Sequence, residues 1–414
     1  MKITMISMGT TGDVRPIVLL GRELASRGHE ITIAAFSQFR GMVESSGLHF
    51  FRLSGDAEKF IANVMKPGTS ALTFLPQVQK TMKDVAPQLI QDLSNSCDGM
   101  DAMVCSFFGS VFYSIAEQHH IPCVQVHYFP MDPNGNVPIS PVKAQGMGKA
   151  VNELTYRLGY LLIGAVEHHF LSEWRVENGL RDRKPKTMPD YRIGDKEVPV
   201  VYAISPNVLP RPAQWGESIH MSGFWFDETP CTWEPPEDLA RFMEDGEPPV
   251  YIGFGSMNSG DMNKTMTKVL RAVRASGVRA VINLGWSGQK LHSGSKVYFG
   301  EYIPHDWLFP RVRAVVHHGG AGTTAAGLRY GKPTLVIPFG GDQPFWGERV
   351  YELGCGPKPI SRQSLTVQKL TKALLDLNST PRYRVAAEEM SERLNMEKGT
   401  VKAADIIEKE IANW

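Results

Sequence analysis

The 414-residue sequence contains no apolar run long enough to cross a membrane. A membrane-spanning helix needs about 20 consecutive apolar residues, whereas the runs here are short segments such as VVYAI and YLLIGAV. The first residues, MKITMISMGTTGD, do not resemble a secretory signal, because glycine, threonine and aspartate interrupt the apolar stretch after a few residues. We therefore expect a soluble cytoplasmic protein.

Cysteine is scarce, and neither sign of charge is in excess. The five cysteines are odd in number, widely spaced and mostly inside apolar stretches, which indicates reduced core thiols in a cytoplasmic protein. They are Cys97, Cys105, Cys123, Cys231 and Cys355. Lysine and arginine total 44 against 43 aspartates and glutamates, so the sequence gives no electrostatic reason to expect nucleic acid or an anionic membrane as the main partner.

Length and periodicity predict two α/β domains. A chain of 414 residues is longer than one hydrophobic core usually organises, and short β-branched runs alternate with helical patterns, which is typical of parallel sheets covered by helices. The first set of expected strands comprises residues 2–7, 30–36, 49–53, 102–107, 122–129 and 200–205, and the second comprises residues 249–254, 279–284, 297–303, 314–317 and 334–338. We expect two Rossmann-like domains that face each other across a cleft.

A segment rich in proline and acidic residues, DETPCTWEPPEDLARFMEDGEPP, separates the two sets of strands. This composition predicts an interdomain linker with a short helix near residues 238–244. We place the amino-terminal domain at residues 1–225 and the carboxyl-terminal domain at residues 226–394. The remaining residues, 395–414, have the pattern of an amphipathic helix.

The segment at residues 135–195 is longer than a strand-to-helix connection requires. It mixes aromatic, basic and apolar residues and contains the helical pattern AVNELTYRLGYLLIGAVEHHFLSEW. Such insertions often shape a binding pocket, but amphipathic helices are also often plain packing elements. Both interpretations, a pocket wall and a packed helical pair, remain open at this point.

The stretch VHHGGAGTTAAGLRYG predicts a strand that ends near His317, a glycine-rich turn and a helix. The free N–H groups and the partial positive charge of a helix start bind phosphate groups, and glycines allow their close approach. His317 can donate a further hydrogen bond, and Thr323 offers a hydroxyl. A tight turn with core histidines is the alternative.

Asp342 and Gln343 follow the next expected strand, at the same edge of the sheet. A carboxylate beside an amide suits sugar hydroxyls, which need both acceptors and donors. Asp342 could instead be the N-cap of the helix that begins QPFWG, with Pro344 in its first turn. Phosphate-binding and hydroxyl-binding groups one strand apart predict a nucleotide-sugar ligand.

The motifs HHGGAGTTAAG and PFGGDQPFWG, with PHDWLFP before them and GTTGDVRP near the amino terminus, resemble the family 1 glycosyltransferases of GT-B fold. The resemblance covers both expected domains and is strongest to the sterol 3β-glucosyltransferase and antibiotic glycosyltransferase branches. It implies transfer of a sugar from a UDP- or TDP-sugar, above all UDP-glucose, to a hydroxyl of an apolar sterol, flavonoid or phenolic polyketide. The anomeric carbon would be inverted without a metal. A lipid acceptor would allow a peripheral membrane contact.

The resemblance also implies a set of site residues. The donor diphosphate would bind His317 and the glycine-rich turn, and the sugar hydroxyls would bind Asp342 and Gln343. Tyr302 lies near the position where the plant branch stacks a tryptophan on uracil. The donor contacts would be Thr11, Gly12, Ser256, Tyr302, Ile303, His317, Gly320, Ala321, Gly322, Thr323, Asp342 and Gln343, and the acceptor contacts Phe345 and Trp346. Relatives return the carboxyl-terminal helix to the first domain.

Asp13 is the predicted general base. A strand breaks at Gly9 and a helix follows, so Asp13 is expected at the carboxyl end of the strand. A reacting hydroxyl needs a base within hydrogen-bond reach, and related sequences carry a catalytic His or Asp at this position. Helix N-capping ahead of Val14 is the alternative. Thr11 stands where the related branches have arginine.

No two aspartates are two residues apart, so the sequence lacks the Asp-x-Asp motif that is common in enzymes with a divalent metal at the diphosphate. The histidine pairs lack matching ligand clusters, and no metal or cofactor is expected beyond the nucleotide-sugar co-substrate. Two other functions remain open. One is a nucleotide-sugar epimerase of the same fold. The other is a catalytically silent, glycosyltransferase-like partner protein, although Asp13 and HHGGAGT are both intact.

Overall fold

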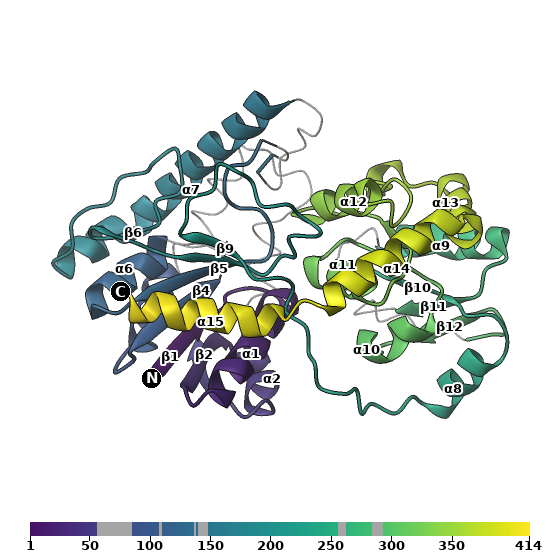
Figure 1. Cartoon of the computed structure of the whole chain (residues 1–414), viewed down its shortest axis with the longest axis horizontal. Helices are drawn as coiled ribbons and strands as arrows, with labels where there is room; N and C mark the ends of the chain where they lie inside the picture. The colour runs from purple at the N-terminus through teal and green to yellow at the C-terminus, as the bar shows by residue number, and fades with distance from the viewer. Residues whose placement is uncertain (56–84, 107–109, 136–137, 140–147, 256–261, 284–292) are drawn as a thin grey trace. The chain divides into compact units, whose positions relative to one another are not determined.

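The computed structural model describes residues 1–55, 85–106, 110–135, 138–139, 148–255, 262–283 and 293–414 (Figure 1). The chain divides into two compact units. The first comprises Met1–Pro206, Pro210–Asp227 and Lys398–Trp414, and the second comprises Asn207–Leu209 and Glu228–Glu397. None of the helices in the described ranges has the length and apolar character that a membrane crossing requires.

The first unit contains a parallel sheet of seven strands in the order β3-β2-β1-β4-β5-β8-β9. The strands are β1 (Lys2–Ile6), β2 (Glu30–Phe36), β3 (His49–Leu53), β4 (Ala102–Ser106), β5 (Cys123–His127), β8 (Val200–Tyr202) and β9 (Ile219–Met221). The order reverses between β1 and β4. Because crossover connections are right-handed, α1 (Thr11–Ser26) after β1 and α6 (Ser110–His119) after β4 cover opposite faces of the sheet.

Helices and short elements complete the first unit. The predicted insertion forms one long helix, α7 (Lys149–Glu177), which packs on α6 and is followed by a short hairpin, β6 (Arg192–Ile193) and β7 (Lys196–Glu197). The other helical segments are α2 (Arg40–Glu44), α5 (Ala86–Asn95) and the 3-10 turn η1 (Ser37–Phe39).

The second unit contains a parallel sheet of five strands in the order β12-β11-β10-β13-β14. The strands are β10 (Val250–Gly253), β11 (Ala280–Asn283), β12 (Val297–Gly300), β13 (Ala314–His317) and β14 (Thr334–Val336). The helices are α8 (Glu237–Glu244), α9 (Met262–Ser276), α10 (His305–Leu308), α11 (Ala321–Arg329), α12 (Gln343–Glu352), α13 (Val367–Ser379) and α14 (Pro381–Asn395), with the 3-10 turns η2 (Phe309–Arg311) and η3 (Arg362–Ser364). Both units are Rossmann-like, as the sequence predicts.

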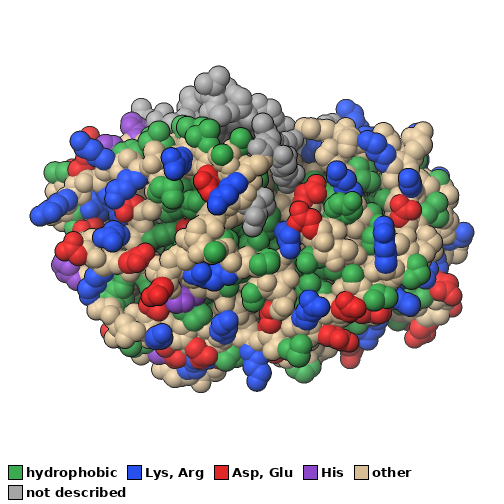
Figure 2. Space-filling model, turned by 45° about the horizontal axis from the view of Figure 1, so that its top comes forward, with side chains coloured by type: hydrophobic (Ala, Val, Ile, Leu, Met, Phe, Trp, Pro, Cys, Tyr) green, Lys and Arg blue, Asp and Glu red, His purple; other side chains and the backbone are tan. Residues whose placement is uncertain are grey.

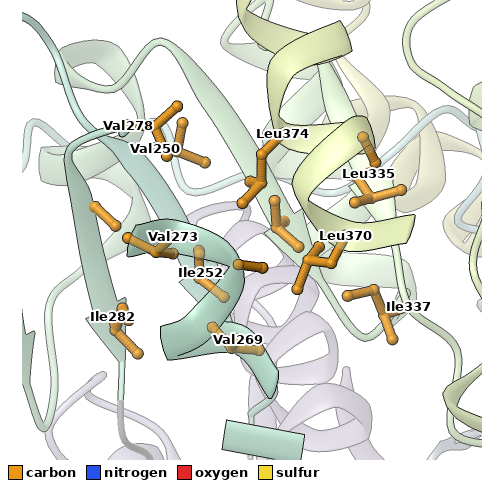
Figure 3. Close-up of a cluster of buried hydrophobic side chains, with 14 of the residues drawn as sticks. Val250, Ile252, Val269, Val273, Val278, Ile282, Leu335, Ile337, Leu370 and Leu374 are labelled. Atoms are coloured by element: carbon orange, nitrogen blue, oxygen red, sulfur yellow. The ribbon is translucent and has the colours of Figure 1, made fainter. Parts of the chain in front are cut away.

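Alternation along the strands of the second unit builds two hydrophobic cores. Side chains of successive residues point to opposite faces of a sheet. Val250 and Ile252 of β10 pack with α9 and α13 on one face (Figure 3), whereas Tyr251 packs with α8 on the other face. The apolar strands are therefore buried on both faces, as is typical of a parallel sheet covered by helices.

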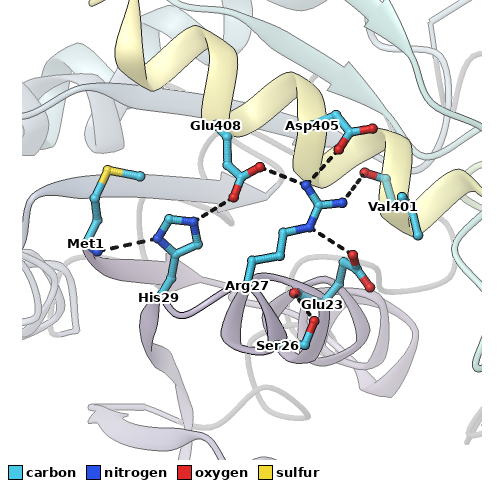
Figure 4. Close-up of polar contacts among 8 residues, drawn as sticks. All are labelled: Met1, Glu23, Ser26, Arg27, His29, Val401, Asp405 and Glu408. Carbon is cyan, nitrogen blue, oxygen red and sulfur yellow. Dashed lines mark hydrogen bonds and ion pairs between the residues drawn. The ribbon is translucent and has the colours of Figure 1, made fainter.

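The last helix, α15 (Gly399–Ala412), belongs to the first unit and lies against α1 (Figure 1). Arg27, which follows α1, donates to Asp405 and Glu408 of α15 at 2.7 Å each (Figure 4). His29 is 2.8 Å from the other oxygen of Glu408. A Cβ at Gly399 would lie 2.1 Å from the Phe224 carbonyl oxygen, so only glycine fits where α15 begins.

We expect the hydrogen bonds from Arg27 to Asp405 and Glu408 to hold α15 against the rest of the first unit. Arg27→Met removes the donors to Asp405 and Glu408, and we expect the amides of α15 to exchange with solvent about tenfold faster or more. Native-state hydrogen exchange measures this. The control is Arg40→Met, because Arg40 pairs with Glu44 of its own helix, α2, and both side chains are exposed, at 54% and 50% accessible. Equal exchange in α15 of both variants would contradict the prediction.

Candidate functional site

The glycine-rich turn between β13 and α11 leaves the start of the helix open. Gly319 has a φ of +95°, and a Cβ there would lie 2.6 Å from Val336 Cγ1, so the turn requires glycine. The N-cap residue of α11 is Gly320, which has no side chain to accept hydrogen bonds from the first-turn amides. Ala321, Gly322 and Thr323 form this first turn.

His317, the last residue of β13, is buried directly below this turn. Its Nδ1 accepts a hydrogen bond from the Gly319 amide at 2.9 Å, which assigns the ring proton to Nε2. Nε2 is buried and has no hydrogen-bond partner among the described residues. Burial holds the pKa of His317 well below its usual value, and the nearby His318 and His305 lower it further. The ring is therefore a neutral donor, and an unpartnered donor in such a place is costly.

His318 fills the space between two neighbouring loops of the second unit. β10 and β13 pair side by side, with Gly253 opposite His317. A Cβ at Gly255, after β10, would lie 3.1 Å from His318 Cε1, and a Cβ at Gly320 would lie 2.7 Å from its Nε2. Burial lowers the pKa of His318 to about 4. A neutral imidazole thus separates the two loops at the point where the strand order of this sheet reverses.

Asp342 and Gln343 lie at the start of α12, as the sequence predicts for either of their two roles. Asp342 is the N-cap residue, but its side chain makes no capping hydrogen bond to the backbone. Its Oδ2 accepts from Trp346 Nε1 at 2.7 Å instead. The amide oxygen of Gln343 accepts from the backbone N–H groups of Phe339 and Gly340, at 2.8 and 3.2 Å. Both side chains therefore shape the loop between β14 and α12.

The structure gives Phe345 and Trp346 a different place from the predicted one. They were expected as acceptor contacts, but Trp346 is fully buried and Phe345 is 9% exposed. The two rings pack on each other with centroids 4.8 Å apart. The physical reason is that α12 packs its apolar face on β14, and the Trp346 indole also holds Asp342. Neither ring forms an open apolar surface.

The remaining predicted donor contacts differ in exposure. Tyr302 is 71% exposed, so its ring face is free to stack on another ring. The side chain of Ile303 is buried in the core around Tyr251, so a donor contact at this residue would have to come from its backbone. Ser256 lies outside the described residues. Thr11 and Gly12 are exposed in the first unit, where the Gly12 amide donates to Thr10 Oγ1 at 3.2 Å.

Asp13 is the third residue of α1, immediately after β1 at the reversal of the first sheet. Its Oδ2 accepts from the backbone N–H of Thr10 at 2.7 Å and from the Thr10 hydroxyl at 2.9 Å. The Asp13 carbonyl accepts from the Tyr128 hydroxyl at 3.2 Å. Burial raises the pKa of Asp13, and the two hydrogen bonds from Thr10 oppose that rise.

Thr10 is the residue that the sequence analysis missed. The N-cap of α1 is Thr10, and Asp13 completes a capping box with it, so the predicted alternative of N-capping by Asp13 itself is wrong. The signal was present as Thr-x-x-Asp ahead of an apolar run, a variant of the capping-box pattern. Asp13 is not the N-cap because α1 begins two residues before it, at Thr11, which places Asp13 in the first turn of the helix.

A cavity of about 80 Å³ lies in the first unit between α6, α7 and residues 182–191. Its lining includes Tyr113, His127, Tyr160 and Glu167. One carboxylate oxygen of Glu167 accepts from Ser110, and the other is buried without a partner among the described residues. Complete ligand pockets usually have volumes of roughly 300 to 1,000 Å³, so this cavity fits part of a ligand or several waters.

Outside these loops, the described residues include free thiols and charged side chains of both signs. In the part of the chain that the structure describes, no three His, Cys, Asp or Glu side chains come together as a metal site. All five cysteines are free; Cys231 is exposed and the other four are buried. On the face drawn in Figure 2, basic and acidic side chains are interspersed, and no large patch of one sign is visible.

Comparison with solved structures shows a GT-B fold. The glycotransferase of kitacinnamycin superposes with a TM-score of 0.73 at 19% identity, over 99% of this chain and 98% of the other. The calicheamicin glycosyltransferase CalG4 gives 0.70 at 18% identity, over 99% and 98%. The spinosyn rhamnosyltransferase SpnG, solved with thymidine diphosphate, gives 0.68 at 14% identity, over 99% and 100%.

Sequence comparisons match both halves of the chain to glycosyltransferase families. Residues 3–134 match the glycosyltransferase family 28 N-terminal domain, and residues 289–408 match the erythromycin biosynthesis protein CIII-like C-terminal domain. The sterol 3-beta-glucosyltransferases UGT80A2 and UGT80B1 of Arabidopsis thaliana are 33% and 30% identical, over 97% and 99% of this chain. That of Pichia angusta is 32% identical over 99% of this chain.

This chain spans 64% of the length of UGT80A2, 68% of UGT80B1 and 33% of the Pichia angusta relative. It belongs to the sterol 3-beta-glucosyltransferase family of GT-B glycosyltransferases.

The buried histidines predict an acid-sensitive fold. Burial lowers the pKa of His127 to about 3, below the ordinary value of about 6.5 that it has when unfolded. Its contribution to stability is therefore complete above about pH 6.5 and falls by about 1.4 kcal/mol per pH unit between pH 6.5 and 3. Unfolding of His127→Gln should show a shallower loss over this window, measured by denaturant titration at several pH values.

Asp132 has the opposite effect on the pH dependence of stability. Burial raises its pKa to about 6, so it favours the folded state as the pH falls from 6 toward 4. It accepts from Tyr191, whose hydroxyl is 3.3 Å from His127 Nε2. Asp132 is present in both wild type and His127→Gln, so its effect on the pH dependence largely cancels when the two are compared. His169→Gln, at an exposed histidine, is the control, and parallel slopes for wild type and His127→Gln would refute the account.

Proposed function

We propose that this protein transfers glucose from UDP-glucose to a hydroxyl of an apolar small molecule, with a sterol as the first acceptor to test. The observation that carries the proposal is the buried, unpartnered Nε2 of His317 beside the uncapped first turn of α11. A donor with no partner in the described chain, next to free helix amides, fits an anionic ligand group. Membership of the sterol 3-beta-glucosyltransferase family supports a nucleotide-sugar diphosphate as that group.

The proposed chemistry needs the diphosphate to leave with its negative charge stabilised. His317 and the amides of Ala321, Gly322 and Thr323 would hydrogen-bond to that group, and preorganised donors of this kind supply a large part of such catalysis. The exposed Tyr302 ring offers a stacking surface for the base of the nucleotide. These donors need no divalent metal, and we propose a metal-independent reaction. TDP is the second nucleotide to test, because neighbours of this fold were solved with it.

Asp13 is the proposed base. It would take the proton of the acceptor hydroxyl as that oxygen attacks the anomeric carbon from the side opposite the diphosphate, which inverts the configuration. Burial, which raises the pKa of Asp13, strengthens it as a proton acceptor. The curated relatives are named for sterols, and the cavity beside α7 offers room for part of an apolar acceptor.

Asp13→Asn tests the proposal, because the amide keeps the shape of the carboxylate but is not a base. Wild type and variant are incubated with UDP-glucose and a panel of sterols, flavonoids and phenolic polyketides, and UDP release and acceptor mass are measured. We expect a hexose on at least one acceptor, and a rate at least about a hundredfold lower for a folded variant that still binds UDP.

The other outcomes separate the alternatives. Conversion of the sugar nucleotide without any acceptor would favour an epimerase. If no sugar nucleotide binds, the proposal fails and a catalytically silent partner protein takes its place. If UDP-glucose binds but no acceptor gains mass, the proposed donor sugar or acceptor class is wrong.

A pair of His317 variants tests the donor site. Asn places an amide oxygen near the position of Nδ1, so His317→Asn keeps the bond from Gly319 but loses the donor at Nε2. Gln places an amide nitrogen near Nε2, so His317→Gln keeps that donor. We expect UDP to bind at least about tenfold more weakly to the Asn variant and within about threefold of wild type to the Gln variant, by calorimetry. The reverse order would contradict the assigned role of Nε2.

A further inference from the structure

The two carboxylate oxygens of Asp13 have different environments. Oδ2 accepts two hydrogen bonds, both from Thr10. Oδ1 receives no hydrogen bond from the residues that the structure describes. The carboxylate is also packed closely over Gly9, where a Cβ would lie 2.2 Å from Oδ2. One oxygen is thus fixed to the loop that leads into α1, and the other is left to accept a proton.

The Thr10 hydroxyl donates its hydrogen to Asp13 Oδ2. A hydroxyl has a single O–H donor, and the Gly12 amide already donates to Thr10 Oγ1 at 3.2 Å. The hydroxyl acts there as an acceptor, so its own hydrogen is left for Asp13 Oδ2 at 2.9 Å. The backbone of Asp13 is fixed as well, because its amide donates to the Thr10 carbonyl at 2.9 Å. A serine could replace the threonine, whereas valine, with the same shape, could not.

We propose that Thr10 is a positioning residue for Asp13: it fixes the carboxylate through Oδ2 so that Oδ1 is the atom that accepts the proton of the acceptor hydroxyl. The inference rests on the proposed role of Asp13 as the base. In the step, Oδ1 takes the proton, the acceptor oxygen bonds to the anomeric carbon, and the bond from that carbon to the diphosphate oxygen breaks with its electron pair leaving on UDP. Asp13 is then a neutral acid and returns its proton to solvent.

Hydrogen bonds to a carboxylate favour its charged form. Loss of the Thr10 hydroxyl therefore raises the pKa of Asp13 and moves the acid limb of the kcat profile to higher pH. The titratable neighbour, Tyr128, donates to the Asp13 carbonyl, and burial raises its pKa well above 10, so it stays protonated throughout. An account in which Thr10 only caps α1 predicts lower stability without this displacement.

The test compares Thr10→Val, Thr10→Ser and Thr366→Val in the full chain, with UDP-glucose and the acceptor found active. Thr366 is the matched control, because it also caps a helix, α13, by accepting from the Lys369 amide at 3.2 Å. We expect Thr10→Val to lower kcat about tenfold and to move the acid limb up by about one pH unit. KM for UDP-glucose should stay within about twofold of wild type. Thr10→Ser should restore both values, and Thr366→Val should change neither.

A second readout does not need turnover. The carboxyl carbon of Asp13, observed by NMR in labelled protein, should titrate at higher pH in Thr10→Val than in wild type. An unmoved titration and acid limb would overturn the proposal, and so would a raised KM for UDP-glucose with unchanged kcat. Full activity of Asp13→Asn would remove the base role itself, and the proposal would fall with the proposed function rather than on the geometry of Thr10.

Discussion

The reversal of strand order in each parallel sheet is the constraint on which both candidate sites depend. In the first unit the order reverses between β1 and β4, and in the second between β10 and β13. Connections on the two sides of a reversal run to opposite faces of the sheet, so the loops above the carboxyl ends of these strands separate and leave room for a ligand. Asp13 follows β1, and the turn after His317 follows β13, so each lies at the reversal of its own sheet.

The first-turn amides of α1 and α11 differ in how they are capped. At α1 the capping box of Thr10 and Asp13 satisfies the helix start from within the chain and fixes a carboxylate there. At α11 the cap is glycine, no side chain covers the amides, and His317 keeps a buried donor without a described partner. The start of α1 carries a carboxylate of this chain, and the open start of α11 is the proposed site for an anionic group of a ligand. The proposed base and the proposed anion site thus lie on the same kind of strand-turn-helix unit.

Much of this arrangement could be predicted from the sequence, because it depends on local patterns. The β-branched runs predicted eleven strands, β1 to β5, β8 and β10 to β14, within a few residues, but not the two-residue strands β6 and β7. The glycine-rich turn predicted the open start of α11. Strand β9 was not predicted either, because it has only three residues, one of them a histidine, and so lacks a β-branched run. Side-chain partners could not be predicted, because they depend on contacts in space: the indole of Trp346 turns inward to Asp342, and the amide oxygen of Gln343 turns to the loop at Phe339.

The configuration of the glycoside tests the central claim most directly. The proposed base at Asp13 and the proposed diphosphate site at the start of α11 predict a single displacement, which would turn the α-linked glucose of UDP-glucose into a β-glucoside. The coupling of the anomeric proton in the NMR spectrum of the purified product measures this. A β-glucoside is the predicted result. An α-glucoside would contradict the account, because retention requires a second displacement or attack from the same face, and neither would use Asp13 as proposed.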